Sequence, residues 1–211
     1  MTFQQQAYAN AAETIIKNLK KRNMEGFYCA SSEDAVNMVK ELIPAGSSVT
    51  WGGSESMVES GIMDAVKQGD YELIDRTAAK TPEEARTLYG KIVCADYFFT
   101  GTNAITTDGE LINIDGNGNR VACLITGPAN VIVIAGMNKV VANVEDGVRR
   151  IRNIATPANV LRVGVDTPCS KTGVCQDCLS PGCICNQIVV TRRSGKAGRI
   201  KVLLVGESLG F

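Results

Sequence analysis

The segment Thr167–Cys185 contains residues that are able to bind a metal ion or take part in redox chemistry. It holds five of the eight cysteines, spaced C-x5-C-x2-C-x4-C-x-C: Cys169, Cys175, Cys178, Cys183 and Cys185. Prolines and glycines interrupt this segment, so backbone hydrogen bonding alone is not expected to order it. Thiolates that share one ion would order it, and the two-residue spacing between Cys175 and Cys178 suits two ligands of the same ion.

Three interpretations of the cysteine segment remain open: its thiols bind a metal or cluster, form redox disulfides, or simply pack. Five thiols leave one unpaired in a disulfide scheme, and cysteines this close together favour a metal. A zinc ribbon usually carries two CxxC pairs and this segment has one, whereas iron–sulfur sites accept irregular spacing. An iron–sulfur cluster is therefore favoured over zinc. The other cysteines, Cys29, Cys94 and Cys123, lie in apolar stretches and are predicted to be buried and inert.

The composition restricts the class of protein. The chain has 211 residues and 45% hydrophobic content, which is enough for one sizeable core. We predict a single α/β domain over residues 1–211, with the cysteine-rich loop 167–185 inserted within it. Lys plus Arg total 22 and Asp plus Glu total 22, which argues against a nucleic-acid partner. The sequence shows no signal-like or membrane-length apolar run, so we expect a cytoplasmic, reduced protein that does not bind membranes.

The chain has no histidine. This absence excludes Ser–His–Asp and Cys–His catalysis and the HExxH zinc site. Acid–base chemistry must then come from Asp, Glu, Lys, Tyr or Cys, and a transition-metal site must be built mainly from cysteine.

Helical and strand patterns alternate along the chain. Apolar residues spaced by three and four predict helices over 5–22 and 144–155, and capping residues predict helix starts after Ser31 and Thr81. The apolar run 130–135 is typical of a central parallel strand. The predicted fold is a mostly parallel sheet flanked by helices.

Two further strand pairs are predicted. Asp108-Gly109 is a strong hairpin signal between strands over 104–106 and 110–114. Residues 186–192 and 199–206 read as two C-terminal strands around a polar turn, and both are expected to add to the sheet.

A glycine turn after the strand 47–51 is the first candidate ligand site. It comprises Gly52, Gly53, Ser54, Glu55 and Ser56. Two glycines and a serine between a strand and a helix allow backbone N–H groups to converge on an anion. An ordinary tight turn, in which Ser54 only caps the helix, explains the pattern equally well.

The hairpin region and the end of the central strand supply the other candidate ligand residues. They are Gly101, Asn103, Asp108, Gly109, Asn113, Asp115, Gly116, Asn138 and Lys139. Ligands of open α/β sheets bind at the carboxyl ends of strands, where Asn138 and Lys139 are predicted to lie. Four charged residues are candidates for a catalytic role: Glu55, Asp108, Asp115 and Lys139.

Several of these motifs together resemble the LUD (lactate utilisation) domain family. They are TWGGSES, TGTNAITTDGELINIDGNGNR, NVIVIAGMNKVV and TPCSKTGVCQDC, and the last is similar to a cysteine-bearing branch of the family. The resemblance implies a fold like that of NagB, ribose-5-phosphate isomerase (RpiA) and CoA-transferase domains. It also implies that Cys169, Cys175, Cys178 and Cys185 are the usual cysteines, with Cys183 as an additional one whose place among the ligands is open.

Two functions from different classes follow. In the first, the protein is a redox or accessory protein in lactate or organic-acid oxidation, which binds a small anionic or phosphorylated metabolite and works with iron–sulfur electron-transfer proteins. In the second, it is a metabolite-binding regulatory module with a structural zinc. A sugar-phosphate isomerase is a weaker alternative, because it rests on fold analogy alone. The sequence leaves catalysis and homo-oligomer formation open.

Overall fold

The fold is built on a sheet of six parallel strands. The computed structural model describes residues 2–211, and the order of the larger sheet is β1-β10-β7-β4-β2-β3. Its strands are β1 (Glu25–Cys29), β2 (Ser48–Trp51), β3 (Glu72–Ile74), β4 (Tyr97–Gly101), β7 (Asn130–Gly136) and β10 (Ile200–Val205). β7 pairs with β4 on one side and β10 on the other. Its residues after Asn130 are buried, as expected for a strand covered on both faces, so the predicted central strand is confirmed.

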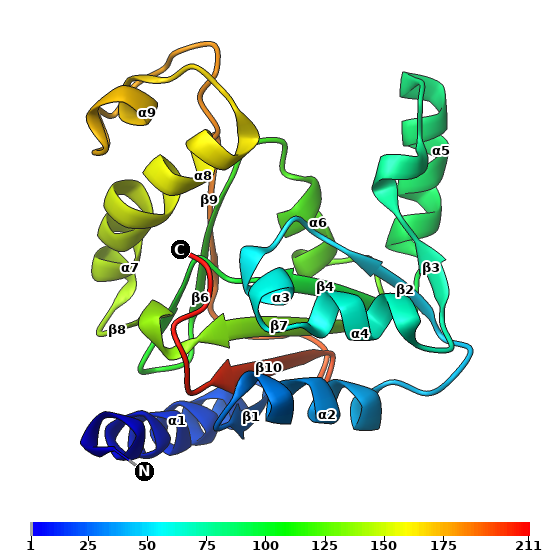
Figure 1. Ribbon diagram of the computed structural model, residues 1–211, viewed down its shortest axis with the longest axis vertical. Coiled ribbons are helices and arrows are strands. Elements are labelled where there is room, and N and C mark those ends of the chain that lie inside the picture. The colour runs from blue at the N-terminus through cyan, green and yellow to red at the C-terminus, as the bar shows by residue number, and fades with distance from the viewer. Residues whose placement is uncertain (1) are drawn as a thin grey trace.

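Helices cover both faces of this sheet (Figure 1). One apolar core contains side chains of α1 (Phe3–Lys21), α5 (Pro82–Val93) and α6 (Asn119–Ile125). The core on the other face contains side chains of α2 (Ser32–Leu42), α3 (Glu55–Glu59) and α4 (Ile62–Gln68). The side chains of Ser31 and Thr81 accept hydrogen bonds from backbone amides of the first turn of α2 and α5, which confirms the predicted helix starts. The predicted α/β class, with a mostly parallel sheet flanked by helices, is confirmed.

A second sheet of four strands has the order β8-β5-β6-β9. It contains β5 (Ala104–Thr106), β6 (Leu111–Asp115), β8 (Val140–Val141) and β9 (Gln187–Thr191). β5 and β6 pair antiparallel, so the predicted hairpin is confirmed. The expectation that both C-terminal strands extend one sheet is wrong, because β9 pairs with β6 and only β10 joins the larger sheet. Residues of β9 alternate between half-buried and exposed, which suits an edge strand and not a central one.

The helix predicted to end at Ala155 continues to Val163. α7 (Val144–Arg150) leads into a π-helical turn, η3 (Ile151–Ala155), and then into α8 (Thr156–Val163). Pro157 follows the π-helical turn directly, within this continuous helix, and it lacks the N–H that an interior helical residue donates. The extension adds about two turns to the helix and brings α8 next to α9 (Pro168–Thr172).

The cysteine segment lies beyond the end of α8, at the top of the molecule in Figure 1. Its first part is a short helix, α9 (Pro168–Thr172), capped by Thr167, so the expectation of an irregular loop throughout is wrong there. Among residues 2–211, two 3₁₀ turns are present, η1 (Arg76–Ala78) and η2 (Met137–Lys139). In the described part of the chain, no helix is both long and apolar enough to cross a membrane.

Candidate functional site

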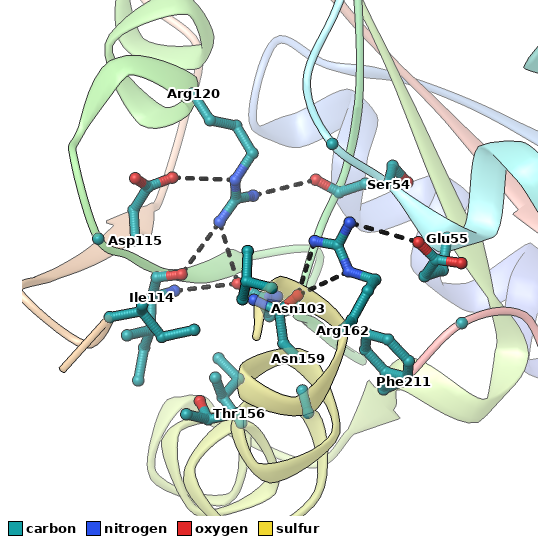
Figure 2. Close-up of a pocket in the computed structure, with 18 of the residues that line it drawn as sticks. Ser54, Glu55, Asn103, Ile114, Asp115, Arg120, Thr156, Asn159, Arg162 and Phe211 are labelled. Atoms are coloured by element: carbon teal, nitrogen blue, oxygen red, sulfur yellow. Dashed lines mark hydrogen bonds and ion pairs between the residues drawn. The ribbon is translucent and has the colours of Figure 1, made fainter. Parts of the chain in front are cut away.

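A cavity of about 260 Å³ lies where the carboxyl ends of β2 and β4 face β6, α8 and the C-terminal residues (Figure 2). We call it the arginine cavity, because Arg76, Arg120 and Arg162 line it. Lys139 is a fourth cationic residue in its wall, and the acidic residues there are Glu55 and Asp115. Cationic side chains are therefore in excess, so the cavity is electrostatically suited to an anion.

Arg120, in the first turn of α6, is bonded through its whole guanidinium group. Its Nε donates to Asp115 Oδ2 at 3.0 Å. Its Nη1 donates to Asn113 Oδ1 at 2.6 Å and to the Gly101 carbonyl at 3.3 Å. Its Nη2 donates to Asn103 Oδ1 at 3.1 Å and to the Ile114 carbonyl at 3.1 Å. An arginine side chain has five N–H donors, so Arg120 supplies charge to the cavity while all of its donors are occupied by protein acceptors.

This network explains the role of three predicted ligand residues. Asn103 Oδ1 also accepts a hydrogen bond from the Ile114 amide, and Asp115 Oδ1 accepts one from the Gly118 amide. Burial lowers the pKa of Arg120, and the neighbouring Asp115 carboxylate opposes that shift. The guanidinium stays charged. Asn103, Asn113 and Asp115 are thus partners of a buried cation that holds β4, β6 and α6 together.

The glycine turn differs from the predicted anion-binding loop. The Gly52 amide donates to the Phe99 carbonyl at 2.9 Å, so it is not available to a ligand. Ser54 precedes α3, but its side chain makes no capping bond, and α3 has only five residues. Gly53 instead lies between two guanidinium groups, since a Cβ at this position would be 3.1 Å from Arg76 Nη2 and 3.7 Å from Arg162 Nη1. The absence of a side chain at Gly53 leaves that space open.

Arg162 and Arg76 retain unused hydrogen-bond donors. Arg162 donates from Nε and Nη2 to Asn159 Oδ1, at 2.9 and 2.7 Å, and its Nη1 lies 3.3 Å from Glu55 Oε1. These contacts leave two of its five N–H groups without a partner among residues 2–211. Arg76 is exposed, and its guanidinium has no hydrogen-bond or ion-pair partner in that range. Both guanidinium groups are therefore able to bind a ligand directly.

Lys139 is buried at the base of the cavity. Its Nζ donates to Ser56 Oγ at 2.7 Å, and Ser56 Oγ donates to the Leu209 carbonyl at 3.2 Å. Burial lowers the pKa of Lys139 to about 8; the positive charges of Arg150 and Arg120 add to the shift, and Glu59 opposes it. This amine therefore responds to pH closer to neutrality than an ordinary lysine does.

The structure brings most of the predicted ligand residues to one place. Those that line the cavity are Gly53, Ser54, Glu55, Gly101, Asn103, Asp115, Gly116 and Lys139. Those that lie behind its wall are Gly52, Ser56, Asn113 and Asn138; Asn138, for example, accepts from the Leu209 amide. Asp108 and Gly109 lie elsewhere, at the hairpin tip against α1, where the Asp108 carbonyl accepts from Arg22. Asn103 and Asp115, which line the cavity, lie at the opposite ends of the hairpin strands from this turn.

The three arginines of the cavity are not among the residues predicted from the sequence. Arg120 directly follows the glycine turn of the predicted hairpin region, so its position within the motif was an available signal. Arg162 lies beyond the predicted end of its helix, and Arg76 lies in a 3₁₀ turn with no recognisable pattern. The C-terminal Gly210 and Phe211 also line the cavity, and nothing local in their sequence indicates it.

Nearly the whole chain matches the model of one protein family. A family model described as the LUD domain matches residues 12–205. The chain belongs to the LUD domain family. This family is associated with lactate utilisation, so the resemblance noted in the sequence is confirmed. No curated protein matches the chain.

One solved structure similar to this LUD protein supports its fold. A DUF162 family protein from Deinococcus radiodurans is 14% identical with a TM-score of 0.52, and the match covers 94% of this chain and 98% of that one. A second match is eIF2B delta from Chaetomium thermophilum, at 20% identity and a TM-score of 0.36, which covers 53% of this chain and 48% of that chain. A third is ribose 5-phosphate isomerase from Plasmodium falciparum, at 19% identity and a TM-score of 0.33, which covers 53% of this chain and 52% of that chain.

The cysteine segment of this LUD protein does not form a coordination site in the described conformation. All eight cysteines are free thiols, and residues 2–211 contain no group of three or more Cys, Asp or Glu side chains arranged to hold a metal ion. Cys169 Sγ lies 3.2 Å from Thr167 Oγ1, and Cys185 Sγ donates to Thr156 Oγ1 at 3.6 Å. The thiolate ligand set predicted from the sequence therefore needs a rearrangement of the segment before it encloses an ion.

The thiols nevertheless lie near one another. Burial raises the pKa of Cys185, a hydrogen bond with Thr156 opposes the shift, and the charges of three other cysteines of the segment raise it further: Cys183, Cys175 and Cys169. Cys183 also lines the arginine cavity. Outside the segment, Cys29 and Cys123 are buried as predicted, but Cys94 is exposed because it caps the end of α5 at the surface.

Proposed function

We propose that this LUD-family protein binds a small carboxylate or phosphate metabolite in the arginine cavity, as a redox or accessory protein in lactate or related organic-acid oxidation. The observation that supports this proposal is the position of Gly53 between the guanidinium groups of Arg76 and Arg162. Both arginines have unused N–H donors, and planar guanidinium groups suit the paired oxygens of a carboxylate or phosphate.

The surrounding charges support an anion in this position. Arg120 is held by its own acceptors and contributes a fixed positive charge at the back of the cavity. Lys139 adds a second positive charge at its base. The carboxylates of Glu55 and Asp115 are paired with Arg162 and Arg120, so their repulsion of a bound anion is reduced.

Calorimetric titration with L-lactate and with inorganic phosphate tests this proposal. Arg76→Gln and Arg162→Gln each remove charge-assisted hydrogen bonds, so each is expected to weaken binding by about tenfold or more. Gly53→Val is expected to act likewise, because its side chain occupies the space between the guanidinium groups. Arg149→Gln is the matched control, since Arg149 lies on α7 with 69% of its side chain exposed. Unchanged affinity in the Arg76→Gln/Arg162→Gln double variant would contradict the proposal.

We propose as a second function that the segment 167–185 binds an iron–sulfur cluster or zinc through Cys169, Cys175, Cys178 and Cys185, with iron–sulfur electron-transfer proteins as partners in the first case. The supporting observation is that five free cysteines lie within residues 169–185 and that the Cys185 amide donates to Cys183 Sγ at 3.4 Å. Eight free thiols fit a reducing, cytoplasmic setting, which is part of this proposal.

Elemental analysis of protein purified without oxygen tests the second function. Bound iron with absorbance near roughly 400 nm is expected for a cluster, and a colourless protein with one zinc supports the structural alternative. Cys175→Ser is expected to lower the metal content. Cys94→Ser, which changes an exposed thiol outside the segment, is expected to leave it unchanged. Protein that contains neither metal after growth with both would refute this function.

A further inference from the structure

A second cavity, of about 320 Å³, adjoins the arginine cavity on the side of α5. We call it the apolar cavity. Its wall is mostly hydrophobic and includes Leu88, Tyr89 and Ile92 of α5, Phe98 of β4 and Cys123 of α6. An apolar cavity of about 150 Å³ is large enough to hold benzene, so the apolar cavity has room for a ring-sized group.

The two cavities share part of their walls. Arg76, Asn119 and Arg120 line both of them. Gly52 lines the apolar cavity and Gly53 lines the arginine cavity, so the glycine pair lies at the boundary. A Cβ at Gly52 would be 3.3 Å from Arg120 Cγ and 3.5 Å from Phe98 Cζ. The methylene stem of Arg120 thus lies against Gly52, while its guanidinium is directed toward Asp115 and Asn103 (Figure 2).

This arrangement places an anion-binding region directly beside an apolar one. Arg76 lines both cavities and has unused N–H donors. If the acidic group of a ligand lies between Arg76 and Arg162, the rest of that ligand extends either to solvent or into the apolar cavity. Burial of an apolar group there would add to the affinity in proportion to the area removed from water. A ligand as small as lactate would leave this second compartment unused.

We infer that the two cavities together bind one amphipathic ligand: a carboxylate or phosphate metabolite that carries an apolar group of about the size of an aromatic ring. This inference rests on the proposed anion site and adds the chemical class of its ligand. The acidic group lies at Arg76 and Arg162, and the apolar group packs against Leu88, Tyr89 and Phe98.

Calorimetric titration of the full-length protein with inorganic phosphate and with phenyl phosphate tests this inference. Phenyl phosphate is expected to bind about tenfold tighter or more. Ala85→Phe places a ring in the apolar cavity from an exposed position of α5, and it is expected to reduce the affinity for phenyl phosphate to within about twofold of that for phosphate. Thr87→Phe is the matched control, because Thr87 is an exposed residue of the same helix that does not line the cavity. It is expected to preserve the difference.

The outcomes separate this inference from the proposed function. If phosphate binds but phenyl phosphate binds no tighter, or if Ala85→Phe preserves the difference, the inference is overturned and the anion site stands. If phenyl phosphate binds in an Ala85→Phe-sensitive way while phosphate and lactate do not bind, the apolar compartment is supported and the proposed binding of small acids fails. Absence of binding by all three probes overturns both.

Discussion

The arginine cavity and the cysteine segment are the two chemically distinctive regions of this protein, and they are stabilised in opposite ways. Arg120 is 14% exposed and its five donors reach acceptors on β4, on β6 and in the Asn103 turn between β4 and β5. The thiols have weak local contacts, such as Cys183 Sγ, which accepts from the Cys185 amide at 3.4 Å. An ion pair of Arg152 with Asp177, which is 81% exposed, is one of the contacts that connect the segment to the rest of the chain.

This difference indicates where a ligand is needed for order. A buried guanidinium with all its donors satisfied fixes the geometry of its surroundings without any ligand. Cys169 is buried and the other four thiols of the segment are half-buried, but their few contacts are local, so their arrangement depends more on what binds them. If the contrast is correct, substitutions in the arginine cavity should affect stability more than substitutions in the cysteine segment.

Arg120→Leu is expected to have the largest effect. It would leave the Asp115 carboxylate, which is 8% exposed, without its cation and would remove hydrogen-bond partners of Asn103 and Asn113. Loss of one member of a buried pair typically costs about 3–5 kcal/mol of unfolding free energy. Urea unfolding measures it. Arg149→Leu, at an exposed pair, is the control and is expected to cost within about 1 kcal/mol. Equal losses in both variants would show that the Arg120 network does not hold the fold together.

The contribution of Lys139 to the free energy of unfolding is expected to depend on pH. Its pKa is lowered to about 8 in the folded state, so between about pH 8 and the ordinary lysine value the unfolded state binds more protons than the folded state. Stability then rises with pH in this window. The unfolding free energy of the wild type is therefore expected to increase, relative to Lys139→Met, when urea unfolding is moved from about pH 7 to about pH 10. A pH-independent difference would show that burial does not perturb this amine.

Anion affinity is expected to change in the opposite direction over the same range. Deprotonation of Lys139 removes one positive charge from the base of the cavity, so phosphate or lactate should bind more weakly as the pH rises through about 8. Calorimetric titrations on both sides of that pH measure the change. The Lys139→Met variant, which has no titrating amine there, should lack it.

Asp177→Asn is expected to have the smallest effect. Asp177 has a positive φ of 47°, a conformation that asparagine also tolerates, so the substitution removes the ion pair with Arg152 and little else. Exposed ion pairs contribute about 0–1 kcal/mol, and urea unfolding of the metal-free protein should show no more than that. A loss as large as that of Arg120→Leu would mean that the cysteine segment is as integral to the fold as the arginine network.

Much of the fold is predictable from the sequence because its signals are local. The spacing of apolar residues in α1, the caps Ser31 and Thr81, the Asp108-Gly109 turn and the apolar run of β7 each depend on a few neighbouring residues. The true end of this helix at Val163 differs from the predicted end at Ala155, because a proline such as Pro157 normally indicates a helix boundary. The helix continues through a π-helical turn, which no local sequence pattern predicts.

For the candidate site, the location of some residues was predictable from the sequence, but their roles were not. Lys139 follows the predicted central strand, so its location near the carboxyl edge of the sheet was predictable from topology. The roles of Asn103 and Asp115 were not, because they depend on Arg120, whose donors take their oxygens.

The helices and most strands, the parallel character of the larger sheet, the family, and the presence of thiols without histidine can all be predicted from the amino-acid sequence. Three features emerge only from the folded chain: β9 leaves the larger sheet, Arg76, Arg120 and Arg162 surround one cavity, and an apolar cavity adjoins it. Helix capping and hydrophobic periodicity depend on near neighbours in the chain and can be read from it. The convergence of three arginines from separate elements depends on long-range packing and on where each buried charge finds its acceptors.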